Sequence, residues 1–258
     1  METLNNIVLT IQNYMSNYVL IIALLGAGLW FSFRLGFIQV RGFGEGMKRT
    51  FGGLFSKKGE AGADGMSSFQ ALATAIAAQV GTGNIAGAAT ALAIGGPGAI
   101  FWMWIAAFLG MATIYAEAIM AQKYKTVGAD GQVTGGPVYY IRAAFKGTFG
   151  KVLAGIFAIL ITLALGFMGN AVQSNSIAAS FHTAFGIPQW IMGLVVAVIA
   201  IFVFMGGMKR IAKVTETIVP FMAALYIIGS LIVIIYNYKN IPYAFASIFI
   251  GAFSPSSV

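Results

Sequence analysis

The sequence predicts an all-α protein that crosses a membrane several times. Of its 258 residues, 59% are hydrophobic and only 9% are charged, whereas soluble domains carry about a quarter charged residues. Long stretches also lack any charge, as between Asp64 and Glu117. The chain has no cysteine, which excludes disulfides and thiol-ligated metal sites. Composition and pattern together predict a polytopic membrane helix bundle with about six transmembrane helices.

Each expected span is an apolar run bounded by charged, glycine-rich or proline-containing residues. In chain order the spans are predicted at residues 18–33, 66–94, 99–122, 152–176, 190–205 and 214–236. A basic segment follows the first span, and its apolar residues recur at near-helical intervals, which predicts an amphipathic helix at the membrane surface. Residues 241–258 are too few to cross the bilayer and are expected to form a short extracellular or re-entrant piece.

The net charge of +8 is concentrated on one side of this arrangement. Of the 15 Lys and Arg residues, all but Lys239 fall in the loops after the first, third and fifth spans. The positive-inside rule therefore places these loops in the cytoplasm and the N-terminus outside. The basic excess is a topological signal and gives no support to nucleic-acid binding. The expected location is the cell (plasma) membrane, with lipid around the helices.

The second span, residues 66–94, is the segment on which function is expected to depend. As one helix it would be roughly 43 Å long, well over the roughly 30 Å of hydrocarbon that a helix must cross. Its middle, Gly81-Thr82-Gly83-Asn84, has poor helix propensity, which predicts a break. Hydrocarbon does not tolerate the freed backbone groups unless protein, water or a ligand satisfies them. We therefore expect a substrate and ion site at the break.

The two helix ends created by the break suit ligands of opposite charge. The N–H groups near Gly83 and Asn84 lie at the positive end of a helix dipole and suit a carboxylate. The carbonyl groups near Ala77, Gln79 and Val80 suit a small cation, a division found in the discontinuous helices of secondary transporters. The residues thus indicate a small zwitterion or carboxylate together with a coupling cation.

Two other interpretations of this segment stay open. Small residues recur at four-residue spacing from Ala73 onward and form a face that packs helices closely without a ligand. Residues 81–86 also match the dinucleotide pattern G-x-G-x-x-A, but they lack the preceding strand and the following acidic residue that a nucleotide site needs. The cluster of Gln79, Thr82 and Asn84 favours a ligand site, because close packing does not require three hydrogen-bonding side chains.

A second polar patch lies in the fourth span. Asn170, Gln173, Ser174 and Asn175 stand close together in an otherwise apolar helix. A single asparagine is most often a contact between helices, but this density predicts the lining of a cavity. We expect Phe167 and Asn170 to face the substrate.

Two acidic residues lie in the predicted spans. Glu117 is either a proton-relay candidate or a helix-end acid bonded to a neighbouring hydroxyl group. Glu216 begins the sixth span close to Lys213, which predicts a surface ion pair. The sequence offers no paired carboxylates, Ser/His/Asp set or His cluster, so we expect no enzyme activity.

Two motifs around the break resemble those of a known family. Residues 79–87, QVGTGNIAG, and residues 95–104, GGPGAIFWMW, are similar to the signature region of the alanine/glycine:cation symporters, also described as sodium:alanine symporters. Residues 134–141, TGGPVYYI, resemble the loop that follows. The resemblance covers most of the chain. It implies sodium-coupled symport of alanine or glycine by alternating access, and a LeuT-type fold of two inverted five-helix repeats after one extra N-terminal helix.

The resemblance also implies residue roles. It places the substrate carboxylate near the backbone of Gly81, Thr82 and Gly83. It places a sodium ion, as coupling ion and not as a prosthetic group, on carbonyl groups and one side chain at the break, namely those of Ala77, Val80, Gln79 and Asn84. Together with the patch in the fourth span, the candidate substrate site comprises Gln79, Gly81, Thr82, Gly83, Asn84, Phe167 and Asn170.

The same resemblance divides the single transmembrane domain, residues 1–258. Residues 1–60 would hold the N-terminal span and the amphipathic segment, residues 61–240 the five-helix first repeat, and residues 241–258 the short extracellular or re-entrant piece. Chains of this family are expected to be much longer, so a missing second repeat or a second copy would be needed to complete the site. We expect a fragment of a longer gene product. The competing interpretation is a channel or a structural membrane subunit without coupled transport.

Overall fold

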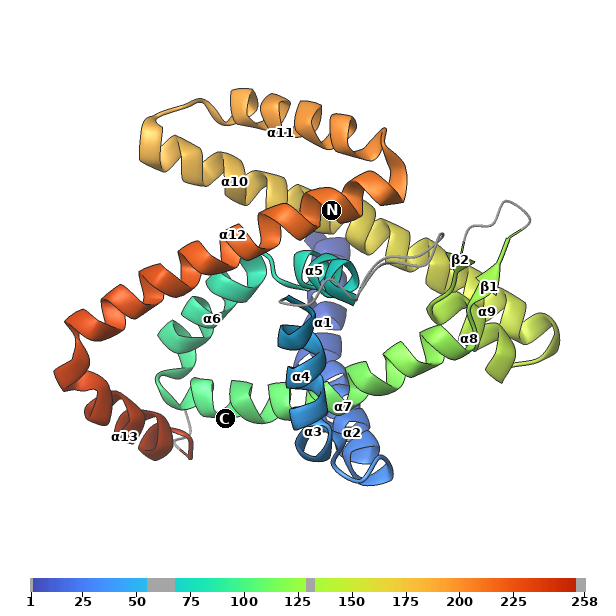
Figure 1. Ribbon diagram of the computed structural model, residues 1–258, viewed down its shortest axis with the longest axis horizontal. Helices are drawn as coiled ribbons and strands as arrows, with labels where there is room; N and C mark the ends of the chain where they lie inside the picture. The colour runs from blue at the N-terminus through green and yellow to red at the C-terminus, as the bar shows by residue number, and fades with distance from the viewer. Residues whose placement is uncertain (1, 55–67, 129–132, 254–258) are drawn as a thin grey trace.

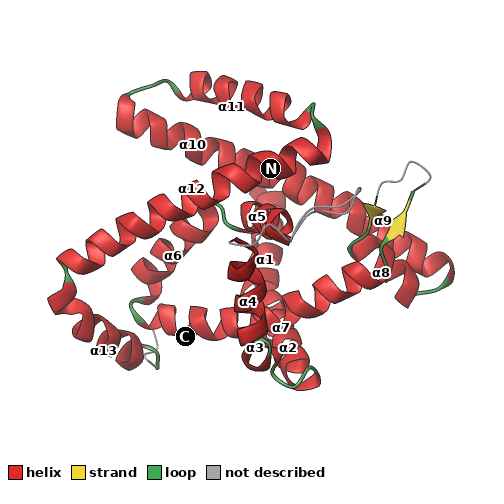
Figure 2. Ribbon diagram, viewed as in Figure 1, coloured by secondary structure: helices red, strands yellow, loops and turns green. Residues whose placement is uncertain are grey.

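The computed structural model describes residues 2–54, 68–128 and 133–253. Nearly all of this part of the chain is helical (Figures 1 and 2). Two short strands, β1 (Thr126–Val127) and β2 (Val133–Thr134), pair in antiparallel fashion with Thr126 opposite Thr134. The all-α expectation is therefore confirmed, apart from this small hairpin.

The N-terminal half of the described chain runs from α1 to α7. Its helices are α1 (Glu2–Tyr14), the π-helix η1 (Met15–Leu20), α2 (Ile21–Arg34), α3 (Ile38–Arg41), α4 (Phe43–Leu54), α5 (Ser68–Gln79), α6 (Thr82–Gly95) and α7 (Gly98–Lys123). After the hairpin follow α8 (Pro137–Ala144), α9 (Gly147–Ile161), the π-helix η2 (Thr162–Gly169), α10 (Asn170–Phe185), α11 (Gln189–Phe204), α12 (Gly207–Tyr236), the 3₁₀-helix η3 (Tyr238–Asn240) and α13 (Ile241–Gly251).

Four helical stretches of the described residues are long and apolar enough to cross a membrane. They are Asn5–Arg34, Gly98–Lys123, Gly147–Phe185 and Gly207–Tyr236, and they contain the predicted first, third, fourth and sixth spans. The predicted fifth span is α11, an apolar helix of 16 residues. The predicted second span is divided between α5 and α6. These helices make the chain a multi-pass membrane protein.

Small residues make up most of the buried apolar side chains of the described part of the chain. The buried apolar side chains of the described part are Ala73, Leu109, Ala112, Ala116, Ala154, Ala178, Ala212, Val219 and Ala252. Gly28 of α2 lies so close to α7 that a Cβ there would be 2.8 Å from the Cβ of Leu109. Small residues let helix backbones approach closely, which is how helices associate in lipid. Many large apolar side chains, by contrast, point outward, as suits a hydrocarbon solvent.

The short C-terminal helix α13 packs on the start of α7 (Figure 1). The indole N–H of Trp102 donates a hydrogen bond to the carbonyl group of Ala252 at 2.7 Å. The backbones of Gly98 and Gly251 touch at this point, leaving no room for a side chain at Gly98. Residues 241–251 form a short helix that is held against the turn connecting α6 to α7.

The loop after α7 folds back onto the end of that helix. The hydroxyl group of Tyr140 in α8 donates a hydrogen bond to the carboxyl group of Glu117 at 3.4 Å. Of the two roles considered for Glu117, the structure therefore supports the acid bonded to a neighbouring hydroxyl group. Partial burial, followed by the charge of Glu117 and this hydrogen bond, raises the pKa of Tyr140 above its ordinary value.

We expect Gly28→Leu to destabilise the contact between α2 and α7. The new side chain would have to displace Leu109, and overpacking of this kind costs about 1–3 kcal/mol. The loss would appear as a lower melting temperature of the purified full-length protein in detergent. Gly26→Leu is the matched control, because a Cβ at Gly26 meets nothing within 4 Å. Equal melting temperatures for the two variants would contradict the packing described here.

Tyr140 also predicts a pH dependence of stability. The pKa of Tyr140 is raised in the folded state, so its protonated form stabilises the fold. This contribution to the free energy of unfolding is complete below the ordinary tyrosine pKa of 10.0 and is lost as the pH rises above that value. Melting temperatures measured from about pH 9 to 11 should therefore fall more steeply for the unmodified protein than for Tyr140→Phe. Tyr236→Phe, at a side chain that is 88% exposed, should keep the steeper fall. Identical curves for all three proteins would rule out this role of Tyr140.

Candidate functional site

The predicted break in the second span is present in the structure. Helix α5 ends at Gln79, helix α6 begins at Thr82, and Val80 and Gly81 between them are not helical. Gly81 has an extended backbone, with φ −130° and ψ −173°. The break thus lies at the start of the glycine-rich stretch, and Gly83 belongs to the first turn of α6.

Hydrogen bonds at the start of α6 show how the break is held. The N–H group of Gly81 donates to the side-chain Oδ1 of Asn84 at 3.0 Å, and the N–H group of Asn84 donates to the carbonyl of Gly81 at 3.1 Å. Asn84 therefore caps the helix from inside its first turn. Between these bonds, the N–H group of Gly83 has no hydrogen-bond partner among the residues that the structure describes. This donor is available at the positive end of α6.

Carbonyl groups become available at the other side of the break. The last turn of α5 closes with the N–H group of Val80 donating to the carbonyl of Ile76 at 2.8 Å. In a continuous helix the N–H group of Gly81 would next bond the carbonyl of Ala77. It bonds Asn84 instead, so the carbonyl of Ala77 loses its helical donor. The break therefore places free acceptors and a free donor within a few residues of each other.

Gln173 of α10 contacts the break from the side. Its Oε1 accepts hydrogen bonds from the backbone N–H of Thr82 at 3.2 Å and from the Thr82 hydroxyl group at 3.0 Å. The Gln173 amide also lies against Gly81, where any Cβ would collide with it. Gln173 belongs to the polar patch of the fourth span but lies outside the site predicted from the sequence. Its position one turn after Asn170 was the available signal.

The structure does not bring the other two fourth-span candidates to the break. The side-chain amide of Asn170 donates to the carbonyl of Gly166 in its own helix at 2.8 Å, and Phe167 is 69% exposed. Phe167 lies in η2, and π-helical turns of this kind occur often at functional sites. Asn170 precedes Gln173 by three residues and so shares its side of the helix. Their contact with a substrate stays a prediction.

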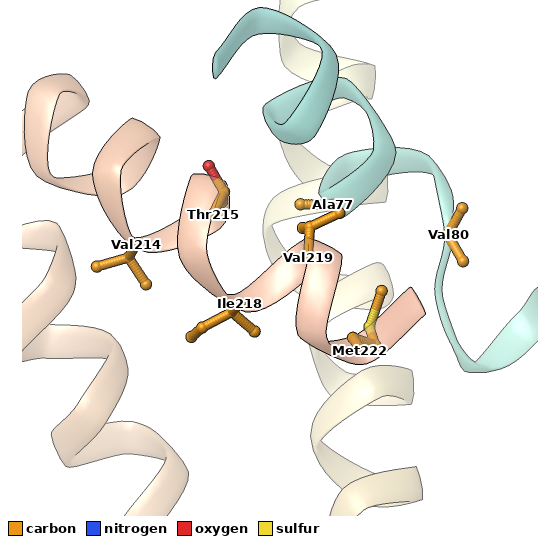
Figure 3. Close-up of a pocket in the computed structure, with 7 residues that line it drawn as sticks. All are labelled: Ala77, Val80, Val214, Thr215, Ile218, Val219 and Met222. Carbon is orange, nitrogen blue, oxygen red and sulfur yellow. The ribbon is translucent and has the colours of Figure 1, made fainter. Parts of the chain in front are cut away.

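A cavity of about 150 Å³ lies next to the break, between α5 and α12 (Figure 3). Ala77 and Val80 form one wall and five residues of α12 form the other: Val214, Thr215, Ile218, Val219 and Met222. All of these side chains except Thr215 are apolar. The cavity therefore adjoins the two residues whose carbonyl groups were predicted to bind sodium.

Polar contacts join α5 to α12 beside this cavity. The side-chain amide of Gln70 donates to the carboxyl group of Glu216 at 2.9 Å, and the hydroxyl groups of Thr74 and Thr215 lie 3.1 Å apart. The predicted ion pair between Glu216 and Lys213 is thus wrong. The reason is tertiary, because α5 supplies a nearer partner than the neighbouring turn of α12 does.

The oxygen atoms at the break limit which metal ions it can bind. The described residues hold no group of three or more His, Cys, Asp or Glu side chains placed to bind a metal ion. The oxygens at the break are neutral carbonyl groups, with the Oδ1 of Asn84 already accepting one hydrogen bond. Neutral oxygens of this kind suit a hard cation of low charge and not a transition metal. The residues present therefore fit a sodium ion.

Comparison with known proteins shows which family the chain belongs to. Residues 1–258 match the sodium:alanine symporter family. The chain is 43% identical over 254 residues to the sodium/alanine symporter AgcS of Methanococcus maripaludis, covering 98% of this chain and 55% of that protein. It is 43% identical over 249 residues to the amino-acid carrier protein AlsT of Bacillus subtilis, covering 96% and 51%.

A third relative is a sodium/proton-dependent alanine carrier protein of Bacillus sp. strain PS3. It is 40% identical over 204 residues, which cover 78% of this chain and 44% of that protein. The chain thus spans about half the length of the curated relatives it matches. The family match covers every residue of the chain, and the chain belongs to the sodium:alanine symporter family.

Proposed function

We propose that this chain carries the broken-helix half of a secondary active transporter, which moves alanine or glycine together with sodium by alternating access. The observation that carries the proposal is the break itself. There the free N–H group of Gly83 and the released carbonyl group of Ala77 lie on opposite sides of Gly81. Membership of a symporter family supports the same conclusion and argues against an enzyme.

The substrate carboxylate would bind at the start of α6. The N–H group of Gly83 is the available donor there, beside the backbone of Gly81 and Thr82. Gln173 acts as a positioning residue, because it fixes the Thr82 backbone. A small carboxylate at a helix N-terminus gains both hydrogen bonds and the favourable dipole. Gln79, Asn84, Phe167 and Asn170 complete the proposed substrate site.

The sodium ion would bind to the carbonyl groups of Ala77, Gln79 and Val80. Oδ1 of Asn84 would be a further ligand through the lone pair that the Gly81 N–H does not use. When bound, sodium supplies positive charge to a group of partial negative charges at the end of α5. Its binding would hold the two half-helices in one geometry, which favours the substrate-ready state.

The proposed architecture is one half of a LeuT-type fold. Residues 61–240 would form the first five-helix repeat, in which α5 and α6 together, and α11, also cross the membrane and give six spans. The N-terminus would lie outside and the basic loops in the cytoplasm. Because the chain spans about half the length of its relatives, a second repeat, or a second copy, would supply the remaining wall of the site.

Uptake by reconstituted protein tests this function. The full-length protein in proteoliposomes should accumulate labelled alanine or glycine when sodium is higher outside, and should not do so when potassium replaces sodium. Accumulation against a concentration gradient separates a symporter from a channel, in which flux is not coupled to sodium. The absence of any flux would favour a structural subunit instead. Competition by D-alanine and by glutamine would define the substrate class.

Asn84→Ala should abolish sodium-driven uptake while leaving membrane insertion intact. The change removes the acceptor for the Gly81 N–H, so the helix start loses the geometry that presents Gly83. Loss of a helix cap typically costs about 1 kcal/mol, which is too small to prevent insertion. Thr90→Ala, further along α6, is the control. Normal uptake by Asn84→Ala would refute the site assignment.

Gln173→Leu should raise the KM for alanine by about tenfold. This variant loses both hydrogen bonds to Thr82, and each is worth roughly 0.5–1.5 kcal/mol. Ser180→Leu places the same side chain in the same helix, at an exposed position whose hydroxyl group bonds the carbonyl of Ser176 in its own helix, and should transport normally. If both variants had the same KM, Gln173 would have no positioning role.

A further inference from the structure

The α8–α9 corner, residues 137–152, carries positive charge that no described residue neutralises. Arg142 of α8, Lys146 immediately before α9 and Lys151 in the first turns of α9 are exposed. None of the three forms an ion pair or a hydrogen bond with another residue that the structure describes. The sequence also has no acidic residue between Asp130 and Glu216. The corner therefore presents its cations to whatever surrounds the protein there.

Exposed apolar side chains lie at the same corner. The rings of Phe145 and Phe149 pack edge to face with their centroids 5.6 Å apart, and the two side chains are 48% and 65% exposed. Val152 and Ile156, three and seven residues after Phe149, continue this exposed apolar surface along α9. Aromatic rings next to basic side chains are typical of the region where a helix enters the membrane.

The backbone holds the corner in a defined shape. Helix α8 packs against α9 at one end of the molecule (Figure 1). The carbonyl of Phe145 lies so close to Gly150 that no side chain fits there. Gly147, where the chain turns into α9, has a φ of +80°, which glycine adopts without strain. The hydrogen bond from Tyr140 to Glu117 joins α8 to α7. The cations and the rings are thus presented together by a fixed turn.

The helix that begins at this corner needs a fixed depth in the membrane. Gly147–Phe185 is one apolar helical stretch of 39 residues, roughly 58 Å long against roughly 30 Å of hydrocarbon. Because its apolar length exceeds the bilayer, that length alone does not set its position, and side chains at the interface must do so. The same helix carries Gln173, which bonds Thr82 at the break.

We propose that the α8–α9 corner binds an anionic phospholipid and thereby fixes the start of this long helix at the membrane surface. Arg142, Lys146 and Lys151 attract the lipid phosphate, for which a guanidinium group is a bidentate donor. Phe145 and Phe149 contact the glycerol and the first acyl carbons. A soluble anion would leave the rings exposed, and a zwitterionic lipid would leave the cations without net negative charge. The inference does not depend on the proposed transport function.

The side of the membrane is consistent with this partner. The corner belongs to the basic loop after the third predicted span, which the positive-inside rule places in the cytoplasm. The cytoplasmic leaflet is the one that carries a negative surface potential from anionic lipids, and this potential attracts basic segments close to a membrane-spanning helix.

A fluorescent label at the corner tests the proposal. These 258 residues contain no native cysteine, so Thr148→Cys introduces one thiol into them at an exposed position between Lys146 and Lys151. The experiment uses the full-length protein in neutral detergent, with any cysteines elsewhere replaced and an environment-sensitive fluorophore on the thiol. Phosphatidylglycerol and phosphatidylcholine are each titrated into the micelles. Phosphatidylglycerol should bind at a lower mole fraction, and this preference should shrink as the salt concentration rises.

Charge-neutralising variants make the result specific to the corner. Arg142→Gln, Lys146→Gln and Lys151→Gln should each weaken phosphatidylglycerol binding about fivefold, the factor that corresponds to about 1 kcal/mol for one basic side chain near anionic lipid. The triple variant should bind the two lipids equally. Lys239→Gln is the matched control, because it removes the same charge from an exposed position beyond the far end of α12 and should keep the full preference.

The other outcomes overturn the proposal. Equal binding of phosphatidylglycerol and phosphatidylcholine by the unmodified protein would show that the corner does not select an anionic lipid. An unchanged preference in the triple variant would assign the lipid to another part of the surface. Displacement of phosphatidylglycerol by glycerol phosphate at equal concentration would show a site for a soluble anion, without a role for the acyl chains or the two rings.

Discussion

This structure depends on one constraint: inside hydrocarbon, every backbone N–H and C=O group needs a hydrogen-bond partner. Most of the chain meets it with continuous helices. Between α5 and α6 the helix is interrupted, and side chains replace part of the missing helical hydrogen bonds. The side chain of Asn84 accepts a hydrogen bond from the N–H of Gly81, and that of Gln173 accepts one from the N–H of Thr82. Two backbone groups stay unsatisfied. The N–H of Gly83 can bind a carboxylate, and the carbonyl of Ala77 can bind a cation.

Close approach of helix backbones depends on small residues. Alanines and glycines occupy the contacts of α2 with α7, of α5 with α12 and of α13 with α7. In lipid there is no hydrophobic force to bring helices together, so contact distance and hydrogen bonds decide which pairs form. The pairing of α5 with α12 combines Ala73 and Ala212 with two side-chain hydrogen bonds. It leaves a cavity beside the break, and close packing and a ligand site thus occur in the same segment.

Much of the architecture could be predicted from residue patterns. Apolar runs located the long helices, and the length of residues 66–94 together with the Gly81-Thr82-Gly83-Asn84 stretch located the break. The partners of polar side chains could not be predicted in the same way. Glu216 is three residues from Lys213, which favoured a local ion pair, but its hydrogen-bond donor is Gln70, 146 residues away in the sequence. Gln173 stands in a polar patch of the sequence, but its hydrogen bond with Thr82 depends on how α10 lies against α6.

The sequence by itself determined the membrane class, the helical segments, the break and the family resemblance, because each depends on local composition, propensity or a contiguous motif. Only the tertiary structure decided which helices meet. It made Asn84 a cap, gave Tyr140 to Glu117 as a hydrogen-bond donor, and placed the cavity between α5 and α12. The physical reason is that pairing between distant segments depends on the relative positions of whole helices. Those positions result from many small packing contacts that no single stretch of sequence specifies.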